Sequence, residues 1–136
     1  MKLFLAIKTL TVINIILGIL LLAILLHELY IYIQGRRSAK VLTEEEFKEG
    51  MRKAQVVDIR EREDFNAGHI LGARNIPYST LANSYGSFRK DQPIYLYDRK
   101  KSLAVRSAIK LKKQGYKDIY ILKTGFQEWT GKTKRK

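Results

Sequence analysis

The sequence predicts a small α/β domain with a mainly parallel sheet flanked by helices, preceded by one apolar N-terminal helix. Short apolar runs of strand length alternate with longer helical segments, which is typical of a parallel sheet. A run of 18 uncharged residues, 9–26, stands apart from this pattern. We therefore divide the 136 residues into a transmembrane anchor (1–34), a basic linker (35–40), a domain (41–131) and a basic tail (132–136).

The N-terminal run predicts one span of the bilayer. It is mostly Leu and Ile, and after His27 and Glu28 the apolar stretch resumes as LYIYI, so residues 9–33 are long enough to cross the hydrocarbon core. A cleaved signal peptide is disfavoured because no small-residue cleavage site follows Leu26, and a buried core helix because no polar stripe interrupts the run. Basic residues follow the span closely, which favours a single-pass plasma-membrane protein with a cytoplasmic C-terminal domain.

The elements of the domain follow from local patterns. Thr43 and Glu46 have the spacing of a capping box and predict a short helix through Met51. Apolar runs predict strands at 54–59, 73–77, 94–97 and 118–122. Between and after them we expect a polar loop at 60–64, a turn at 65–70, a short helix with a loop at 80–91, a helix at 102–114, a final helix starting at 125–129, and a frayed tail.

The loop after the strand at 94–97 is the candidate site. A strand that leads through a tight loop into a helix directs several backbone N–H groups into one space, which favours an anion. Asp98 stands at this turn, and its carboxylate can be held there by charge-assisted hydrogen bonds. Ser102 is the expected N-cap of the helix. The alternative is an acid–base or phosphoryl-accepting role for Asp98, and the residues that would then hold an anionic substrate are Arg99, Lys100 and Lys101.

Composition excludes several kinds of site. The chain has no cysteine, so it has no disulfide, thiolate metal site or cysteine nucleophile. We expect no cofactor and no metal, because the adjacent His27 and Glu28 are too few for a coordination shell.

The basic residues are unevenly placed. The formal net charge is +13, and from Arg99 onward there are 13 Lys and Arg residues against two acids. Such a segment is either a solvated face or a surface for anionic lipid headgroups. Nucleic acid is disfavoured as a partner because the basic residues are not interleaved with exposed aromatic residues.

Three segments resemble the signatures of rhodanese-like domains. These are VVDIRERED (56–64), FNAGHILGARNIP (65–77) and GYKDIYILKTGFQEW (115–129). The resemblance implies that family's fold. It also implies an active-site loop headed by a cysteine that carries a persulfide. Counting back from Gly115 in the family's spacing places Asp98 at the cysteine position, and the loop then consists of Asp98, Arg99, Lys100, Lys101, Ser102 and Leu103.

The loop departs from the family pattern in several places. Lys101 stands where the family often has glycine, and Thr124 replaces the first glycine of its G-G-F segment. Related phosphatases need an arginine where this chain has Ala104. The remaining signature residues, to which we assign structural roles, are Asp58, Arg60, Gly68, His69, Gly125 and Trp129. We expect Asp58 and Arg60 to join the strand end to the next turn, and the glycines to meet conformational needs.

Together these features predict a membrane-tethered domain that is inactive as a sulfurtransferase. A carboxylate cannot replace a thiolate in sulfur transfer, because the persulfide is a covalent S–S species. We expect a binding or regulatory module with an unidentified protein partner. The alternative is an enzyme that acts on an oxyanion or phosphate-bearing substrate through the Asp98 loop.

Overall fold

The computed structural model describes residues 1–136, which form two units, Met1–Ile33 and Gln34–Lys136. The first unit consists of most of the helix α1, Lys2–Ser38, whose side chains are exposed along nearly its whole length. The helix is long and apolar enough to cross a membrane, although a signal sequence near an N-terminus meets the same criteria.

The end of α1 belongs to the second unit and differs from the predicted linker. The helix continues to Ser38, and strand β1 (Lys40–Leu42) begins two residues later, so residues 35–40 are almost entirely ordered into elements. Gly35 and Ser38 are buried. A Cβ added at Gly35 would lie 2.5 Å from Cγ1 of Val105, so the glycine permits a close approach that the polar composition of this segment concealed.

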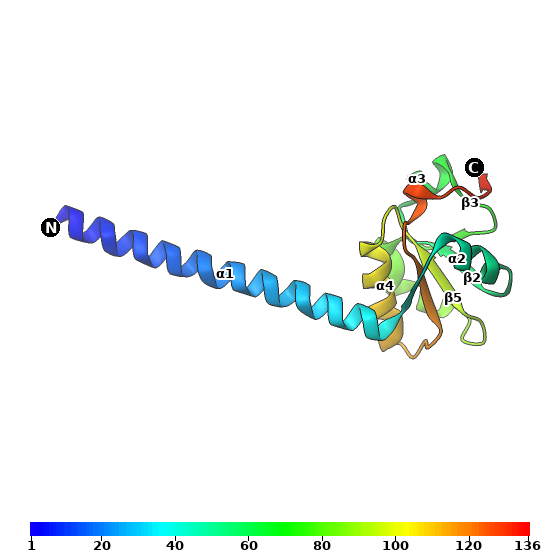
Figure 1. Ribbon diagram of the computed structural model, residues 1–136, viewed down its shortest axis with the longest axis horizontal. Coiled ribbons are helices and arrows are strands. Elements are labelled where there is room, and N and C mark those ends of the chain that lie inside the picture. Colours follow the sequence, from blue (N-terminus) through cyan, green and yellow to red (C-terminus); the bar gives the residue numbers. More distant parts are fainter. The chain divides into compact units, whose positions relative to one another are not determined.

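The core of the second unit is a five-stranded sheet in which all the neighbouring strands are parallel (Figure 1). This confirms the predicted mainly parallel sheet. The strand order is β1-β6-β5-β2-β4. The remaining bounds are β2 (Gln55–Asp58), β4 (Arg74–Asn75), β5 (Ile94–Tyr97) and β6 (Ile119–Leu122). A separate antiparallel pair joins β3 (His69–Ile70) to β7 (Thr133–Lys134).

Helices and 3-10 turns connect these strands. The helices are α2 (Glu44–Gly50), α3 (Arg62–Ala67) and α4 (Ser102–Lys113), and the 3-10 turns are η1 (Met51–Lys53), η2 (Tyr78–Asn83), η3 (Tyr85–Ser87) and η4 (Phe126–Glu128). The predicted capping box of α2 is confirmed, since the N–H of Glu46 donates to Thr43 Oγ1 at 3.3 Å and the N–H of Thr43 donates to Glu46 Oε1 at 3.4 Å.

Several predicted segments are wrong in type, including the turn at 65–70, which holds the end of α3 and strand β3. The polar loop at 60–64 contains the start of α3, whose acidic first turn suits a helix N-terminus. The final helix is only the turn η4. The tail is not frayed, because β7 pairs with β3 and the N–H of Lys136 donates to the carbonyl of Asn66 at 3.0 Å.

The sheet carries one cluster of buried side chains on each face. Figure 1 shows α4 and α2 on opposite sides of the strands. The cluster on the α4 side includes Val57, Leu96, Ala104, Leu111 and Ile121. The cluster on the α2 side includes Phe47, Val56, Tyr95, Tyr97 and Leu122. Every residue of β5 is therefore buried, and the loop that follows β5 starts at the centre of the carboxyl edge of the sheet.

Candidate functional site

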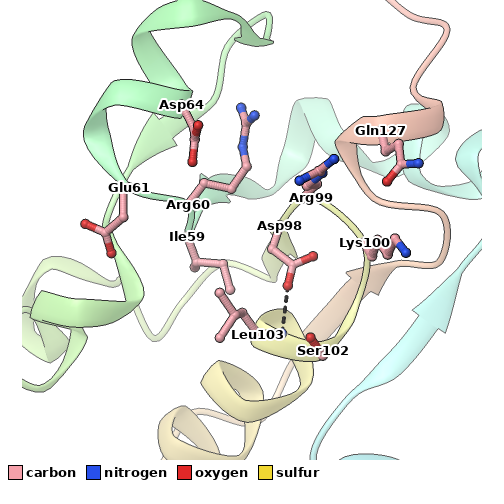
Figure 2. Close-up of a pocket in the computed structure, with 10 residues that line it drawn as sticks. All are labelled: Ile59, Arg60, Glu61, Asp64, Asp98, Arg99, Lys100, Ser102, Leu103 and Gln127. Atoms are coloured by element: carbon pink, nitrogen blue, oxygen red, sulfur yellow. Dashed lines mark hydrogen bonds between the residues drawn. The ribbon is translucent and has the colours of Figure 1, made fainter.

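Asp98 lies directly after β5 and caps helix α4. Its side chain is buried, and Oδ2 accepts a hydrogen bond from the N–H of Leu103 at 2.7 Å (Figure 2). The same oxygen accepts from the N–H of Ala104 at 3.2 Å. The prediction of Ser102 as the N-cap is wrong: the helix begins at Ser102, the N-cap position is Lys101, and neither supplies a side-chain cap. The carboxylate reaches across the loop and binds these amides instead.

The second carboxylate oxygen has no such support. Asp98 Oδ1 is buried and has no hydrogen-bond partner. Burial raises the pKa of Asp98, whereas the N–H groups of Leu103, Ala104 and Lys100 lower it and the nearby Asp58 raises it further. The N–H of Lys100 lowers the pKa of Asp98 by its proximity, although its geometry does not meet that of a hydrogen bond. The net effect is a raised pKa of Asp98. Because only one of its two oxygens accepts hydrogen bonds, the carboxylate is half satisfied.

The segment after β6 closes over the Asp98 loop. The N–H of Phe126 donates to the carbonyl of Asp98 at 2.9 Å, and the N–H of Gln127 donates to that of Arg99 at 3.1 Å. Gly125 has a φ of 67°, and an added Cβ would collide with the carbonyl oxygens of Arg99 and Lys100. Gly125 is therefore required by both its backbone conformation and the space.

A buried ion pair lies beside the loop, at the end of β2. Asp58 is fully buried, and Arg60 Nη2 donates to its Oδ2 at 2.7 Å and to the carbonyl of Gly68 at 2.6 Å. The guanidinium also lies over the ring of Phe126, 4.3 Å from its centroid. Asp58 and Arg60 thus join the strand end to the next turn. Gly68 contributes its carbonyl to this contact. Its φ of 163° is an extended conformation that any residue can adopt, so the predicted conformational need for glycine is not found.

Two further signature residues lie in the core and not in the site. The His69 ring is buried, stacks on Phe65 with 3.7 Å between the centroids, and has Nδ1 2.8 Å from the carbonyl oxygen of Phe65. Trp129 is partly buried and packs edge-on against Phe47 at 6.1 Å. Neither lines the pocket over Asp98.

The pocket over Asp98 has a volume of about 530 Å³. The predicted loop residues that line it are Asp98, Arg99, Lys100, Ser102 and Leu103, whereas Lys101 does not. The other lining residues are Ile59, Arg60, Glu61, Asp64 and Gln127.

The unpaired charges of the pocket lie on two sides, and Arg60, which lies beside Asp64, is already paired with Asp58. Figure 2 shows Glu61 and Asp64 on one side of Asp98, and Arg99, Lys100 and Gln127 on the other. The sequence did not single out Glu61, Asp64 or Gln127. The first two follow β2, and the rule that ligands bind at the carboxyl ends of parallel strands would have found them.

A parallel α/β domain with a strand–loop–helix cradle at its carboxyl edge is the class of protein that these features define. Residues 43–132 match the rhodanese-like domain family, and the chain belongs to that family. It is 46% identical over 123 residues to YqhL, an uncharacterized protein of Bacillus subtilis, a match that covers 90% of this chain and 98% of YqhL. It is also similar to the thiosulfate sulfurtransferase GlpE of Shewanella oneidensis, with 36% identity over 78 residues that cover 57% of this chain and 77% of GlpE.

Solved structures agree with this assignment. A rhodanese-like domain protein from Staphylococcus aureus has a TM-score of 0.59 and 26% identity, over 71% of this chain and 98% of that one. A rhodanese-related protein from Thermoplasma volcanium has a TM-score of 0.64 over 71% and 99% of the two chains. Its identity is 19%, so this likeness shows the fold alone.

Proposed function

We propose that this chain is a membrane-tethered rhodanese-like domain without sulfurtransferase activity that acts as a binding module. The observation that carries the proposal is the carboxylate of Asp98, which binds the amides at the start of α4 in a chain without cysteine. The family resemblance assigns this position to the sulfur-carrying cysteine. A carboxylate forms no persulfide, so this loop has no atom that can carry sulfur.

The pocket supports a binding role. Its acidic side (Glu61 and Asp64) and its basic side (Arg99 and Lys100) lie at the carboxyl edge, where domains of this architecture bind ligands. A protein segment with a basic and an acidic side chain complements both sides. The tether is α1, whose apolar length suits an uncleaved anchor in the plasma membrane, with the domain on the cytoplasmic side.

Phosphate chemistry is the second candidate because Arg99 and Lys100 line the pocket. Against it, the amides of Leu103 and Ala104, which would hold an oxyanion, already bind Asp98. At Ala104 there is also no guanidinium to hold a phosphate. The binding role therefore fits this geometry better.

The activity test uses the full chain in mild detergent with thiosulfate and cyanide. We expect no thiocyanate above a boiled control, and turnover would overturn the claim of inactivity. A panel of phosphate esters tests the second candidate, since hydrolysis that is lost in Asp98→Asn would establish it in place of the binding role.

The binding role is tested in cells with a photo-crosslinking residue at Gln127. We expect a discrete crosslinked protein that is lost in the double variant Arg99→Glu/Lys100→Glu. The matched control is Arg135→Glu/Lys136→Glu, which changes the charge equally at exposed residues outside the pocket. Crosslinks that are absent, or that disappear equally in both variants, would contradict a pocket-specific partner.

A further inference from the structure

The amino edge of the sheet, opposite to the Asp98 pocket, is strongly basic. In a parallel sheet all strands start at one edge, so the segments that lead into β1, β2, β5 and β6 meet there. Each of these segments carries exposed basic residues. We call them the amino-edge basic surface: Arg37, Lys40, Arg52, Lys53, Lys90, Lys112, Lys113 and Lys117.

Local contacts place these segments at the edge. The N–H of Ile94, which starts β5, donates to the carbonyl of Asp118 at 2.7 Å, so Lys117 lies next to the start of β5. The N–H of Gln55, which starts β2, donates to the carbonyl of Pro93 at 2.9 Å. Lys53, the last residue of the turn η1, stands two residues before Gln55 and therefore lies at the same edge.

These charges have no acidic partners within the chain. The three ion pairs of the structure join Lys48 to Glu44, Arg60 to Asp58, and Arg89 to Asp91. None of them uses a residue of the amino-edge basic surface. Two exposed acids also lie at this edge: Asp91 pairs with Arg89, and Asp118 makes no ion pair, so eight basic residues outnumber them. A basic surface without acidic partners attracts an anionic surface, and its field extends about 8–10 Å at physiological salt.

The chain itself indicates which anionic surface this is. The domain is entered at this edge, because β1 starts at Lys40, two residues after α1 ends. The second unit starts at Gln34, eight residues after the uncharged run ends at Leu26. Eight residues span roughly 12 Å as a helix and at most about 28 Å when extended. An anchored α1 therefore keeps the start of the domain, at Gln34, within this distance of the end of the uncharged run.

We propose that the amino-edge basic surface docks on anionic phospholipid headgroups of the bilayer that holds α1. This inference rests on the anchor in the proposed function and adds a lipid contact to it. Docking at the amino edge leaves the carboxyl edge, with the Asp98 pocket, free for a partner. Nucleic acid and acidic proteins offer similar charges, but the tether gives neither of them this proximity.

The test measures lysine acylation by mass spectrometry on the full chain in lipid nanodiscs. Discs of zwitterionic lipid are compared with discs that contain about 30% anionic lipid. We expect acylation of Lys53, Lys112, Lys113 and Lys117 to slow by about threefold or more in the anionic discs, and this protection to vanish at about 1 M salt, where the screening length is ~3 Å. Exposed lysines at the carboxyl edge and in the tail, Lys123, Lys132 and Lys134, serve as references within the same molecule.

Two matched variants sharpen the result. The edge variant replaces Lys53, Lys112, Lys113 and Lys117 by Gln, and the control variant replaces Lys123, Lys132, Lys134 and Lys136 by Gln. All eight side chains are exposed, so both variants lose the same charge. In anionic discs, protection of Lys90 should be lost in the edge variant and kept in the control.

Several outcomes would overturn the inference. Equal acylation in both kinds of disc, or equal protection at both edges, removes the specific surface. Protection produced by added duplex DNA in zwitterionic discs, but not by anionic lipid, assigns the surface to nucleic acid instead. A chain that fails to co-purify with the discs overturns the anchor and this inference with it, whereas co-purification without protection overturns the inference alone.

Discussion

Replacement of Asp98 by alanine removes the group that caps α4, and we expect it to destabilise the domain. Asp98 Oδ2 accepts from the amides of Leu103 and Ala104. Ala104 is fully buried, so its N–H would be left without water or any other partner, whereas Leu103 is 36% exposed and its N–H can bind water. One buried unsatisfied N–H costs about 1–3 kcal/mol, which overlaps the usual cost of losing an N-cap.

The substitution Asp98→Asn separates capping from charge. Its side-chain oxygen can still accept from the two amides, and it removes a buried charge whose Oδ1 has no partner. We therefore expect the free energy of unfolding of Asp98→Asn to lie within about 1 kcal/mol of wild type. Asp98→Ala should lie about 1–3 kcal/mol below wild type.

The assay is urea unfolding of the full chain in mild detergent, followed by the fluorescence of the single tryptophan, Trp129. Ser102→Ala is the control, because Ser102 is the cap that the sequence suggested and its side chain makes no cap bond. Its cost should stay within about 0.5 kcal/mol, as for most surface substitutions. If Asp98→Ala unfolds at the same urea concentration as wild type, or if Ser102→Ala is equally damaging, the capping role of Asp98 is wrong.

Three further predictions concern pH and packing. Burial raises the pKa of Asp98 in the folded chain above its ordinary value of 3.8. Wild type should therefore lose stability relative to Asp98→Asn as the pH rises above 3.8 and through the raised pKa. A difference in unfolding free energy that stays constant with pH would contradict this. Gly35→Ala should destabilise the chain by about 1–3 kcal/mol through overpacking, despite better helix propensity, whereas the matched Gly18→Ala, with open space around it, should not; equal melting temperatures would refute the close contact. Arg60→Leu leaves Asp58 buried without its partner and should cost about 3–5 kcal/mol in urea unfolding, part of which Asp58→Asn restores in the double variant; a loss below about 1 kcal/mol would be inconsistent with this ion pair.

Most of the fold could be predicted because its central strands are buried on both faces. Such strands are short, continuous apolar runs, and the runs at β2, β5 and β6 stand out between polar segments. The helix α3 was hidden for the opposite reason. Its sequence is polar and it buries only Phe65, so it has no apolar stripe. Strand β7 was hidden because two exposed residues, Thr133 and Lys134, pair with a segment more than 60 positions away.

The position of the site and the hydrogen-bonded Asp98 carboxylate were predicted, but the residue that caps α4 was not. An anion cradle after β5 follows from the strand–loop–helix pattern, and Asp98 lies in it. The cap was assigned to Ser102 because Asp98 lies five residues before Leu103, whereas ordinary N-caps reach only two or three residues ahead. Only the folded path of the loop brings the carboxylate to these amides. Likewise, the separation of Glu61 and Asp64 from Arg99 and Lys100 depends on how α3 lies against the loop.

The contact that stabilises the start of α4 also removes the amides that could bind an anion in the Asp98 loop. Its carboxylate satisfies the start of α4 from within, so those amides are not available to stabilise a bound anion or a sulfur-carrying group. The acidic residues Glu61 and Asp64 and the basic residues Arg99 and Lys100 remain in the pocket over this loop. None of these four residues takes part in an ion pair. The chain enters the domain at the other edge of the same sheet, next to Lys40. In the proposed function, attachment at one edge and recognition at the other therefore need not compete.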